Sequence, residues 1–147
     1  MESIWQIAAV KLYAITASIV ALHLLALAVY TAAVRGKHKV FVNPEDAKTF
    51  KGAPGEAEHP DVARVKRAHV NLIESAVPFF VVAFLYALTN PSTLGAQAYF
   101  WTFVVARLLH SVVYIAEKQP FRTILFIIAG LTIIGMAVHV LRFAIAA

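Results

Sequence analysis

The sequence contains no cysteine, and only 8 of its 147 residues are acidic. The absence of cysteine excludes disulfide bonds and thiolate metal sites, so any thiol chemistry must use a thiol that a substrate brings. Charged residues make up 14% of the chain and hydrophobic residues 61%, whereas about 45–50% apolar residues is usual in soluble domains. This composition excludes an ordinary soluble domain and indicates a membrane protein.

Four long apolar stretches account for the excess of hydrophobic residues. A hydrocarbon core of about 30 Å needs about 20 helical residues to cross it, so we expect one membrane domain over residues 1–147, with spans at about 7–35, 62–89, 95–117 and 121–145 and a polar loop at 36–61. The first stretch lacks the cleavage-site pattern of a signal peptide and is expected to remain as a span. The predicted fold class is an all-α, four-helix integral membrane bundle.

Positive charge is concentrated around the first loop. Eight of the thirteen Lys and Arg lie between Arg35 and Arg67, two more flank the third loop at Lys118 and Arg122, and the second loop, residues 89–97, has none. The positive-inside rule then predicts a multi-pass protein whose first and third loops are cytoplasmic and whose termini are outside or lumenal. The compact loops suit a bacterial inner membrane. A basic surface can also bind nucleic acid, but here we interpret it as topology and expect no nucleic-acid partner.

Polar residues recur on one face of the second and third predicted spans. Each set has helical spacing, with Arg67, Asn71 and Glu74 on the second span and Arg107, His110 and Tyr114 on the third. An ionisable residue at the centre of a membrane helix costs roughly 2.5–3.5 kcal/mol, which a partner, a water-filled cavity or a ligand must offset. Glu74 and Arg107 have opposite charge and similar depth on adjacent spans, so we predict that they form a structural ion pair.

The polar set is larger than one ion pair requires, and its surplus is cationic. Arg67, His110 and Arg122 converge on the inner half of the bundle together with Asn71 and Tyr114. Arginine forks bind carboxylates in bidentate fashion, so this surplus indicates a site for an anionic ligand open to the cytoplasm. A channel or transporter is the alternative, but the stripes do not continue through the outer half. We expect no metal, because the sequence has no His-x-x-x-His pair.

Four motifs resemble those of the MAPEG family, the membrane-associated proteins in eicosanoid and glutathione metabolism. They occur in the family's order and spacing: FVNPED at 41–46, RVKRAHVNLIESAVPF at 64–79, ARLLHSVVY at 106–114 and QPFRT at 119–123. The resemblance is strongest to the microsomal glutathione transferase and microsomal prostaglandin E synthase branches. It implies a homotrimer of four-helix subunits that binds glutathione between neighbouring subunits at the cytoplasmic side.

The resemblance also implies roles for individual residues. Glutathione would be bound by Arg35, Arg67, Asn71, Glu74, His110 and Tyr114. Arg122 would be catalytic by stabilising the thiolate, and Asp46 stands where the family has an acid that approaches this arginine. The implied activity is that of a glutathione transferase or peroxidase, which serves detoxification by attacking lipophilic electrophiles or hydroperoxides that enter from the lipid bilayer. A non-catalytic glutathione- or lipid-binding protein of the same fold is the alternative.

Three residues depart from the family's pattern. Val70 replaces an arginine of the prostaglandin synthase branch, Leu72 an aspartate common to both branches, and Phe126 a tyrosine of the synthase branch. These changes weaken the expectation of prostaglandin isomerase activity and leave glutathione binding largely intact. Glutathione has two carboxylates, an ammonium and a thiol, so the arginines suit its carboxylates, and Glu74 or Asn71 suits its ammonium.

Overall fold

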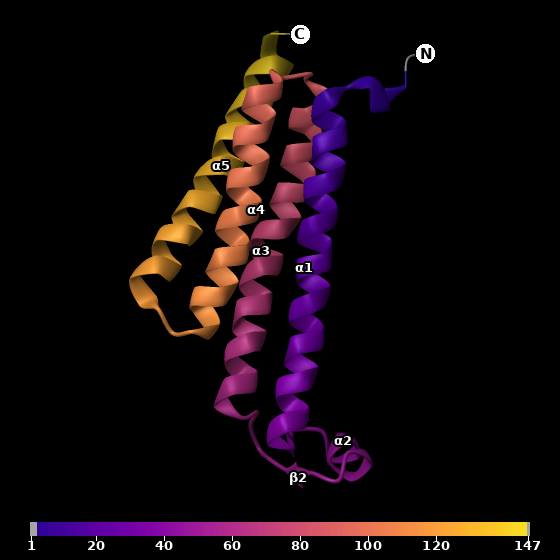
Figure 1. Ribbon diagram of the computed structural model, residues 1–147, viewed down its shortest axis with the longest axis vertical. Helices are drawn as coiled ribbons and strands as arrows, with labels where there is room; N and C mark the ends of the chain where they lie inside the picture. Colours follow the sequence, from indigo (N-terminus) through magenta and orange to yellow (C-terminus); the bar gives the residue numbers. More distant parts are fainter. Residues whose placement is uncertain (1–2, 147) are drawn as a thin grey trace.

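Four long helices run alternately up and down beside one another (Figure 1). The structure is a computed structural model that describes residues 3–146. After a short 3-10 turn, η1 (Ile4–Gln6), the long helices are α1 (Ala8–His38), α3 (Pro60–Leu88), α4 (Thr93–Ile115) and α5 (Gln119–Ala146). Each of the four is long and apolar enough to cross a membrane. The predicted all-α, four-helix fold class is therefore confirmed.

α1 extends to His38, three residues beyond its expected end. Lys39 then adopts the left-handed conformation, with φ 54°, and its amide donates to the carbonyl of Arg35, which closes the last turn. Basic side chains in this turn complement the partial negative charge of a helix C-terminus. This stabilisation explains why α1 continues past its apolar stretch.

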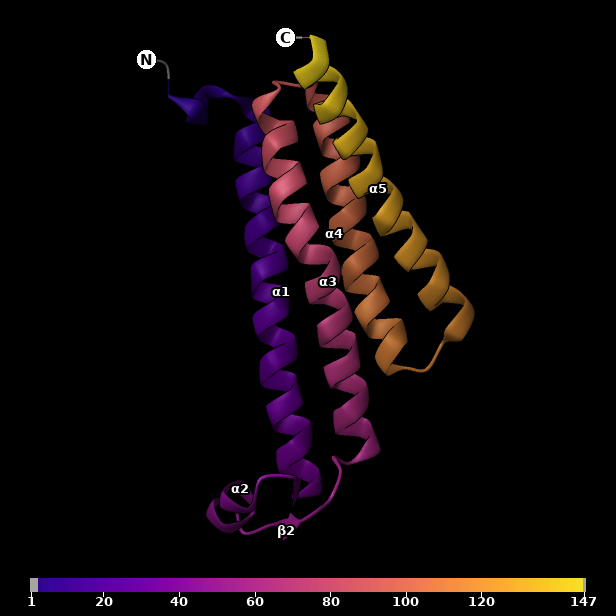
Figure 2. The same ribbon diagram turned by 180° about the vertical axis from the view of Figure 1, so that it is seen from behind.

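The polar loop folds into a compact unit against the ends of α1 and α3. Its elements are β1 (Val40–Phe41), α2 (Pro44–Thr49) and β2 (Ala53–Pro54), and the two short strands pair in parallel. The ring of Phe41 stacks on that of Phe50 at 5.7 Å between centroids. This unit lies at the far end of the bundle from both chain termini, where α1 and α3 project beyond the turn between α4 and α5 (Figures 1 and 2).

α3 begins at Pro60, two residues before its expected start. Pro60 takes the first helical position, where its fixed φ is favourable and its missing amide proton costs nothing. The residue before it, His59, is the N-cap, and its ring Nδ1 accepts a hydrogen bond from the amide of Asp61 at 3.3 Å. The start of α3 thus places His59 and Asp61 beside the end of α1.

Aromatic side chains fill the centre of the bundle. Phe79 of α3 stacks on Phe103 of α4 at 4.0 Å with 2° between the ring planes, and the edge of Phe100 meets Phe79 at 6.2 Å. The hydroxyl of Tyr13 donates to the carbonyl of Phe80 at 3.0 Å and so links α1 to α3. Arg107 follows Phe103 by one turn of α4 and is also fully buried. The interior therefore becomes polar on the side of the bundle nearer the loop.

The outer faces of the long helices are apolar and exposed. On α1, Leu22, Leu25 and Val29 each expose more than 60% of their surface. α5 leans away from α1 and α3 toward its own start (Figure 2). The start of α5 therefore lies farther from α1 and α3 than its end does.

Candidate functional site

Three adjoining cavities follow the N-terminal half of α3. The loop cavity, of about 280 Å³, is lined by Arg35, Val42, Asn43, Asp46, Glu58 and Lys66. The α3 cavity, of about 490 Å³, is lined by Glu58, Ala63, Lys66, Arg67, Val70, Asn71, Glu74 and Tyr114. The α5 cavity, of about 280 Å³, is lined by Asn71, His110, Tyr114, Arg122, Thr123 and Phe126. Shared residues join the cavities in sequence, so the eight residues predicted for binding and catalysis lie along one continuous surface.

In the loop cavity a carboxylate lies between two cations. Glu58 Oε1 is 2.6 Å from Arg35 Nη2, and Glu58 Oε2 is 3.0 Å from Lys66 Nζ. Burial raises the pKa of Glu58, but the hydrogen bonds from Lys66 and Arg35 outweigh it and hold the pKa below its usual value. Sequence reasoning missed Glu58, because it belongs to no motif and only the path of the loop brings it to Arg35.

Asp46 and Arg122 occupy different cavities. Asp46 Oδ2 accepts a hydrogen bond from Asn43 Nδ2 at 3.1 Å in the loop cavity. Arg122 lines the α5 cavity, and within residues 3–146 no salt bridge joins it to Asp46 or to another carboxylate. Among residues 3–146 this acid therefore does not pair with the arginine.

The predicted ion pair between Glu74 and Arg107 is not formed among residues 3–146. Arg107 is fully buried, and its Nη2 donates to the carbonyl oxygen of Asn71 at 2.8 Å and to Asn71 Oδ1 at 2.9 Å. Glu74 is exposed on the outer face of α3, and over the described part of the chain no salt bridge joins the two residues. Asn71 therefore takes the place that the sequence assigned to Glu74 as the partner of Arg107.

The contact with Arg107 fixes the orientation of Asn71. An arginine only donates hydrogen bonds, so the Asn71 oxygen must face it, which leaves the Asn71 amide nitrogen as a donor beside the α3 and α5 cavities. A donor suits a ligand carboxylate and not an ammonium, which leaves Glu74 of the two residues expected to suit the ammonium. The buried Nε and Nη1 of Arg107 and Nδ1 of His110 have no hydrogen-bond partner among residues 3–146.

In the α5 cavity the guanidinium of Arg122 lies over an aromatic ring. Its central carbon is 4.7 Å from the centroid of the Tyr114 ring. The rings of Tyr114 and Phe126 lie on either side of His110, at 5.7 and 6.4 Å between centroids. Stacking restrains the guanidinium without neutralising its charge, so Arg122 offers a positioned positive charge to an anion.

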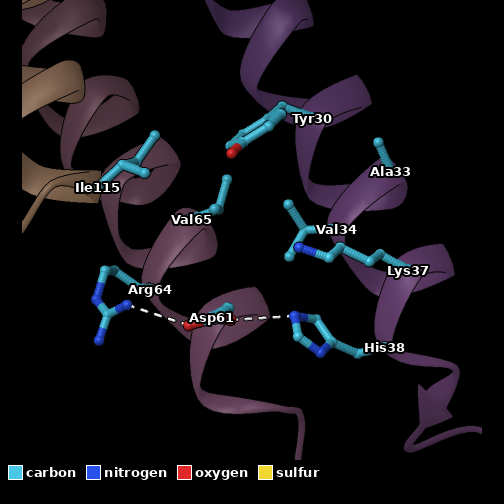
Figure 3. Close-up of a pocket in the computed structure, with 9 residues that line it drawn as sticks. All are labelled: Tyr30, Ala33, Val34, Lys37, His38, Asp61, Arg64, Val65 and Ile115. Atoms are coloured by element: carbon cyan, nitrogen blue, oxygen red, sulfur yellow. Dashed lines mark hydrogen bonds and ion pairs between the residues drawn. The ribbon is translucent and has the colours of Figure 1, made fainter.

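A fourth cavity, of about 320 Å³, lies between α1, the start of α3 and the end of α4 (Figure 3). Across it Asp61 faces His38 on one side and Arg64 on the other. His38, His59 and Asp61 bring their ligand atoms within 4.8 Å of one another. Sequence reasoning, which expected no metal, did not consider this group, because His38 and His59 are far apart in the chain and only the folded loop joins them.

Comparison with known proteins identifies the family. The chain matches the MAPEG family over residues 13–142. It belongs to that family. The resemblance of its motifs is thereby confirmed, and the chain is a multi-pass integral membrane protein.

Individual relatives cover most of the chain. It is 31% identical over 134 residues to "Prostaglandin E synthase" of Homo sapiens, an alignment that spans 90% of this chain and 88% of that protein. It is 35% identical over 115 residues to the Bos taurus protein of the same name, with 78% and 75% covered. It is 36% identical over 135 residues to "Microsomal glutathione S-transferase 1" of Rattus norvegicus, with 86% and 84% covered.

Proposed function

We propose that this protein is a membrane glutathione transferase, with a related peroxidase activity, that ionises the thiol of glutathione for attack on lipophilic electrophiles or hydroperoxides. One observation carries the proposal. Arg67 and Arg122, for which no salt bridge exists among residues 3–146, line one continuous surface with Asn71, Glu74 and Tyr114. In the α3 and α5 cavities these two cations lie beside the carboxylate of Glu74, and this set of charges matches a ligand with two carboxylates and one ammonium.

Each charged group of glutathione has a complementary residue along this surface. Arg67 and the amide nitrogen of Asn71 suit one carboxylate, and Arg35 suits the other once it releases Glu58. Glu74 suits the ammonium. Such charge-assisted hydrogen bonds are shorter and stronger than neutral ones, and they orient the tripeptide so that its thiol reaches the α5 cavity.

Arg122 is the proposed catalytic residue. A free cysteine thiol titrates near about 8.5 and is mostly protonated at neutral pH. A guanidinium beside the sulfur favours the anion, and lowering the thiol pKa by about two units corresponds to about 2.7 kcal/mol. The stacking of Arg122 on Tyr114 supports this role, because the charge is held in place before the substrate arrives.

A homotrimer with its sites between subunits is part of the proposal. Arg67 and Glu74 are exposed on the outer face of α3, where contact with lipid would be costly. A neighbouring subunit against this face would shield them. It would also allow Asp46 and Arg122, which are apart within one subunit, to contribute to one site. The basic loop end would face the cytoplasm, where glutathione is supplied.

Prostaglandin isomerisation is a second candidate, favoured by relatives named prostaglandin E synthase that align over most of the chain. The site itself favours transfer. Val70 lines the α3 cavity and Phe126 lines the α5 cavity, so two of the departures from the synthase pattern lie on the proposed binding surface. Both replace polar groups with apolar ones.

The decisive experiment compares Arg122→Ala and Arg122→Lys with the natural protein, purified in detergent. We expect Arg122→Ala to lose conjugation of an aryl halide and reduction of a lipid hydroperoxide while the assembly persists, and Arg122→Lys to retain part of both. The ultraviolet absorbance of bound thiolate at neutral pH should fall in the same order. Conjugation by Arg122→Ala at the natural rate would refute the catalytic role, and glutathione binding without thiolate would favour a non-catalytic binding protein.

A further inference from the structure

The fourth cavity, between α1, the start of α3 and the end of α4, has a polar side and an apolar side (Figure 3). The lining residues nearer the loop are polar: Lys37, His38, Asp61 and Arg64. Those nearer the centre of the bundle include Tyr30, Val65 and Ile115. We propose that this cavity binds one anionic phospholipid, with its phosphodiester at the polar side and the start of an acyl chain at the apolar side.

The cavity lies at the level of lipid headgroups. α4 ends at Ile115, which lines the cavity, and the exposed residues Glu117 and Lys118 follow in the turn to α5. Charged side chains are costly in hydrocarbon, so this turn marks the polar boundary of the bundle. α1 and α3 project beyond it (Figures 1 and 2). The polar side of the cavity is therefore built by the parts of both helices that extend past the hydrocarbon, and Tyr30 supplies a ring of the type enriched at this boundary.

The cavity lies on a different face of α3 from the proposed assembly surface. Asp61 and Val65 line the cavity from α3. At 3.6 residues per turn, Arg67 and Glu74 lie roughly 150° around the helix from them. Under the proposed arrangement, a neighbouring subunit packed against Glu74 therefore leaves this cavity in contact with lipid.

Two cations of the cavity have donors to give to a phosphate. Lys37 is exposed, extends from α1 toward α3 (Figure 3) and forms no salt bridge among residues 3–146. Arg64 Nη1 is 3.2 Å from Asp61 Oδ1 and its Nη2 is 3.0 Å from Glu117 Oε1. These contacts use two of the five donors of a guanidinium. Phosphate oxygens are strong acceptors for both kinds of cation.

Asp61 is the one carboxylate among the residues that line the cavity, and both of its oxygens have partners. Oδ1 contacts Arg64, and Oδ2 is 3.0 Å from His38 Nε2. The carboxylate therefore holds these two side chains at the polar side, and Lys37 remains as the uncompensated charge of the cavity. The surrounding segment, residues 35–67, has eight Lys and Arg against five acidic residues, and such an excess attracts anionic lipids.

The apolar side distinguishes a lipid from a free phosphate ion. The cavity has a volume of about 320 Å³, within the range of sites for small organic ligands, and a phosphate ion would leave its apolar side empty. An acyl chain fills it. Lipid tails are all equally apolar, so this side cannot choose between lipids of the same chains. Selectivity must come from the headgroup charge, which is the quantity to measure.

The test uses the full-length protein, purified in detergent and washed free of lipid, in native mass spectrometry with added lipids of identical palmitoyl and oleoyl chains. We expect one phosphatidylglycerol per chain, bound at least about tenfold more tightly than phosphatidylcholine. Lys37→Gln and Arg64→Gln should each weaken phosphatidylglycerol binding about fivefold, the factor that one cation contributes near an anionic surface. Lys48→Gln is the matched control, because Lys48 is exposed in α2 and lines none of the four cavities.

Two further measurements separate a built site from general attraction. Ala33 also lines the cavity and is exposed, so Ala33→Phe should occupy its space and weaken phosphatidylglycerol binding about tenfold or more without changing any charge. Glycerol phosphate, which has the headgroup phosphate but no chains, should not displace the lipid at equal concentration.

Several outcomes overturn the proposal. They are no retained phosphatidylglycerol, equal binding of phosphatidylcholine, unchanged binding in Ala33→Phe, or an equal loss in Lys48→Gln and Lys37→Gln, which would indicate diffuse attraction to the basic surface. Displacement by glycerol phosphate would make the cavity a phosphate site and not a lipid site. None of these measurements uses glutathione, so they stand whether or not the protein proves to be a transferase.

Discussion

Replacing Glu58 with glutamine should change stability and glutathione affinity in opposite directions. The Glu58 carboxylate forms salt bridges with Arg35 and Lys66, and only 17% of its side chain is exposed. A glutathione carboxylate that binds Arg35 must first displace it. Glu58→Gln keeps the shape of the side chain but removes its charge. The bundle then loses two ion pairs, and glutathione no longer competes with a protein carboxylate for Arg35.

The size of both effects follows from the two contacts. A hydrogen bond to a charged group is worth about 1.5–3 kcal/mol when shielded. Arg35 and Lys66 are 30% and 51% exposed, and solvent screening reduces the value of such pairs. We therefore expect a loss of about 1–2 kcal/mol in stability. Since about 1.4 kcal/mol is a factor of ten in affinity, glutathione should bind about tenfold more tightly to the variant.

The pH dependence supplies an independent check. The pKa of Glu58 is lowered in the folded protein from its usual value of 4.5. A lowered carboxyl pKa means that the stabilisation is complete above the usual value and disappears as the pH falls through the folded value. The melting temperatures of the natural protein and of Glu58→Gln should thus differ at neutral pH and converge in acid well below 4.5.

The assay is isothermal titration of glutathione into detergent-purified protein, combined with thermal unfolding over a range of pH. Glu56→Gln is the matched control, because Glu56 is exposed in the same loop and forms no salt bridge within the described residues. An unchanged affinity in Glu58→Gln would show that Arg35 is not a ligand for glutathione. A weaker affinity would show that Glu58 itself binds the ligand, which contradicts the competition argument.

Three further substitutions probe other parts of the structure. Arg67→Gln should raise the glutathione dissociation constant about tenfold or more in titration, because a charged hydrogen bond is lost, while the melting temperature stays unchanged. Asn71→Leu should lower stability by about 1–3 kcal/mol in thermal unfolding, because it removes the Oδ1 acceptor of fully buried Arg107. Phe103→Ala should destabilise the bundle by about 3–5 kcal/mol through loss of its stack on Phe79, without changing glutathione affinity; a weaker affinity would mean that the aromatic core shapes the site.

The fold was predictable because the membrane restricts what an apolar segment can do. Backbone polar groups in hydrocarbon must be satisfied internally, so each long apolar stretch must be a helix. Helix ends depend on local chemistry that hydropathy does not describe. α3 begins at Pro60 because of its ring, and α1 continues to His38 because basic residues favour a helix C-terminus.

The candidate site was predictable as a set of residues but not as a set of contacts. Helical spacing places Arg67, Asn71 and Glu74 on one face of α3, and they line one cavity. Spacing does not determine how two helices are rotated against each other. For this reason Arg107 contacts Asn71 and not Glu74, and the contact of Glu58 with Arg35 depends on a loop whose path no periodicity describes.

The exposed carboxylate of Glu74 links ligand binding to assembly. An uncompensated charge at this depth costs roughly 2.5–3.5 kcal/mol in lipid, and no cation of residues 3–146 forms a salt bridge with it. Under the proposed arrangement, a neighbouring subunit shields Glu74 from lipid, and the glutathione ammonium neutralises it. Both act on the same face of α3, so each favours the other. By mass action, a ligand that binds only the assembled form stabilises the assembly, and glutathione should therefore protect the oligomer against dissociation by detergent in proportion to its concentration over its dissociation constant.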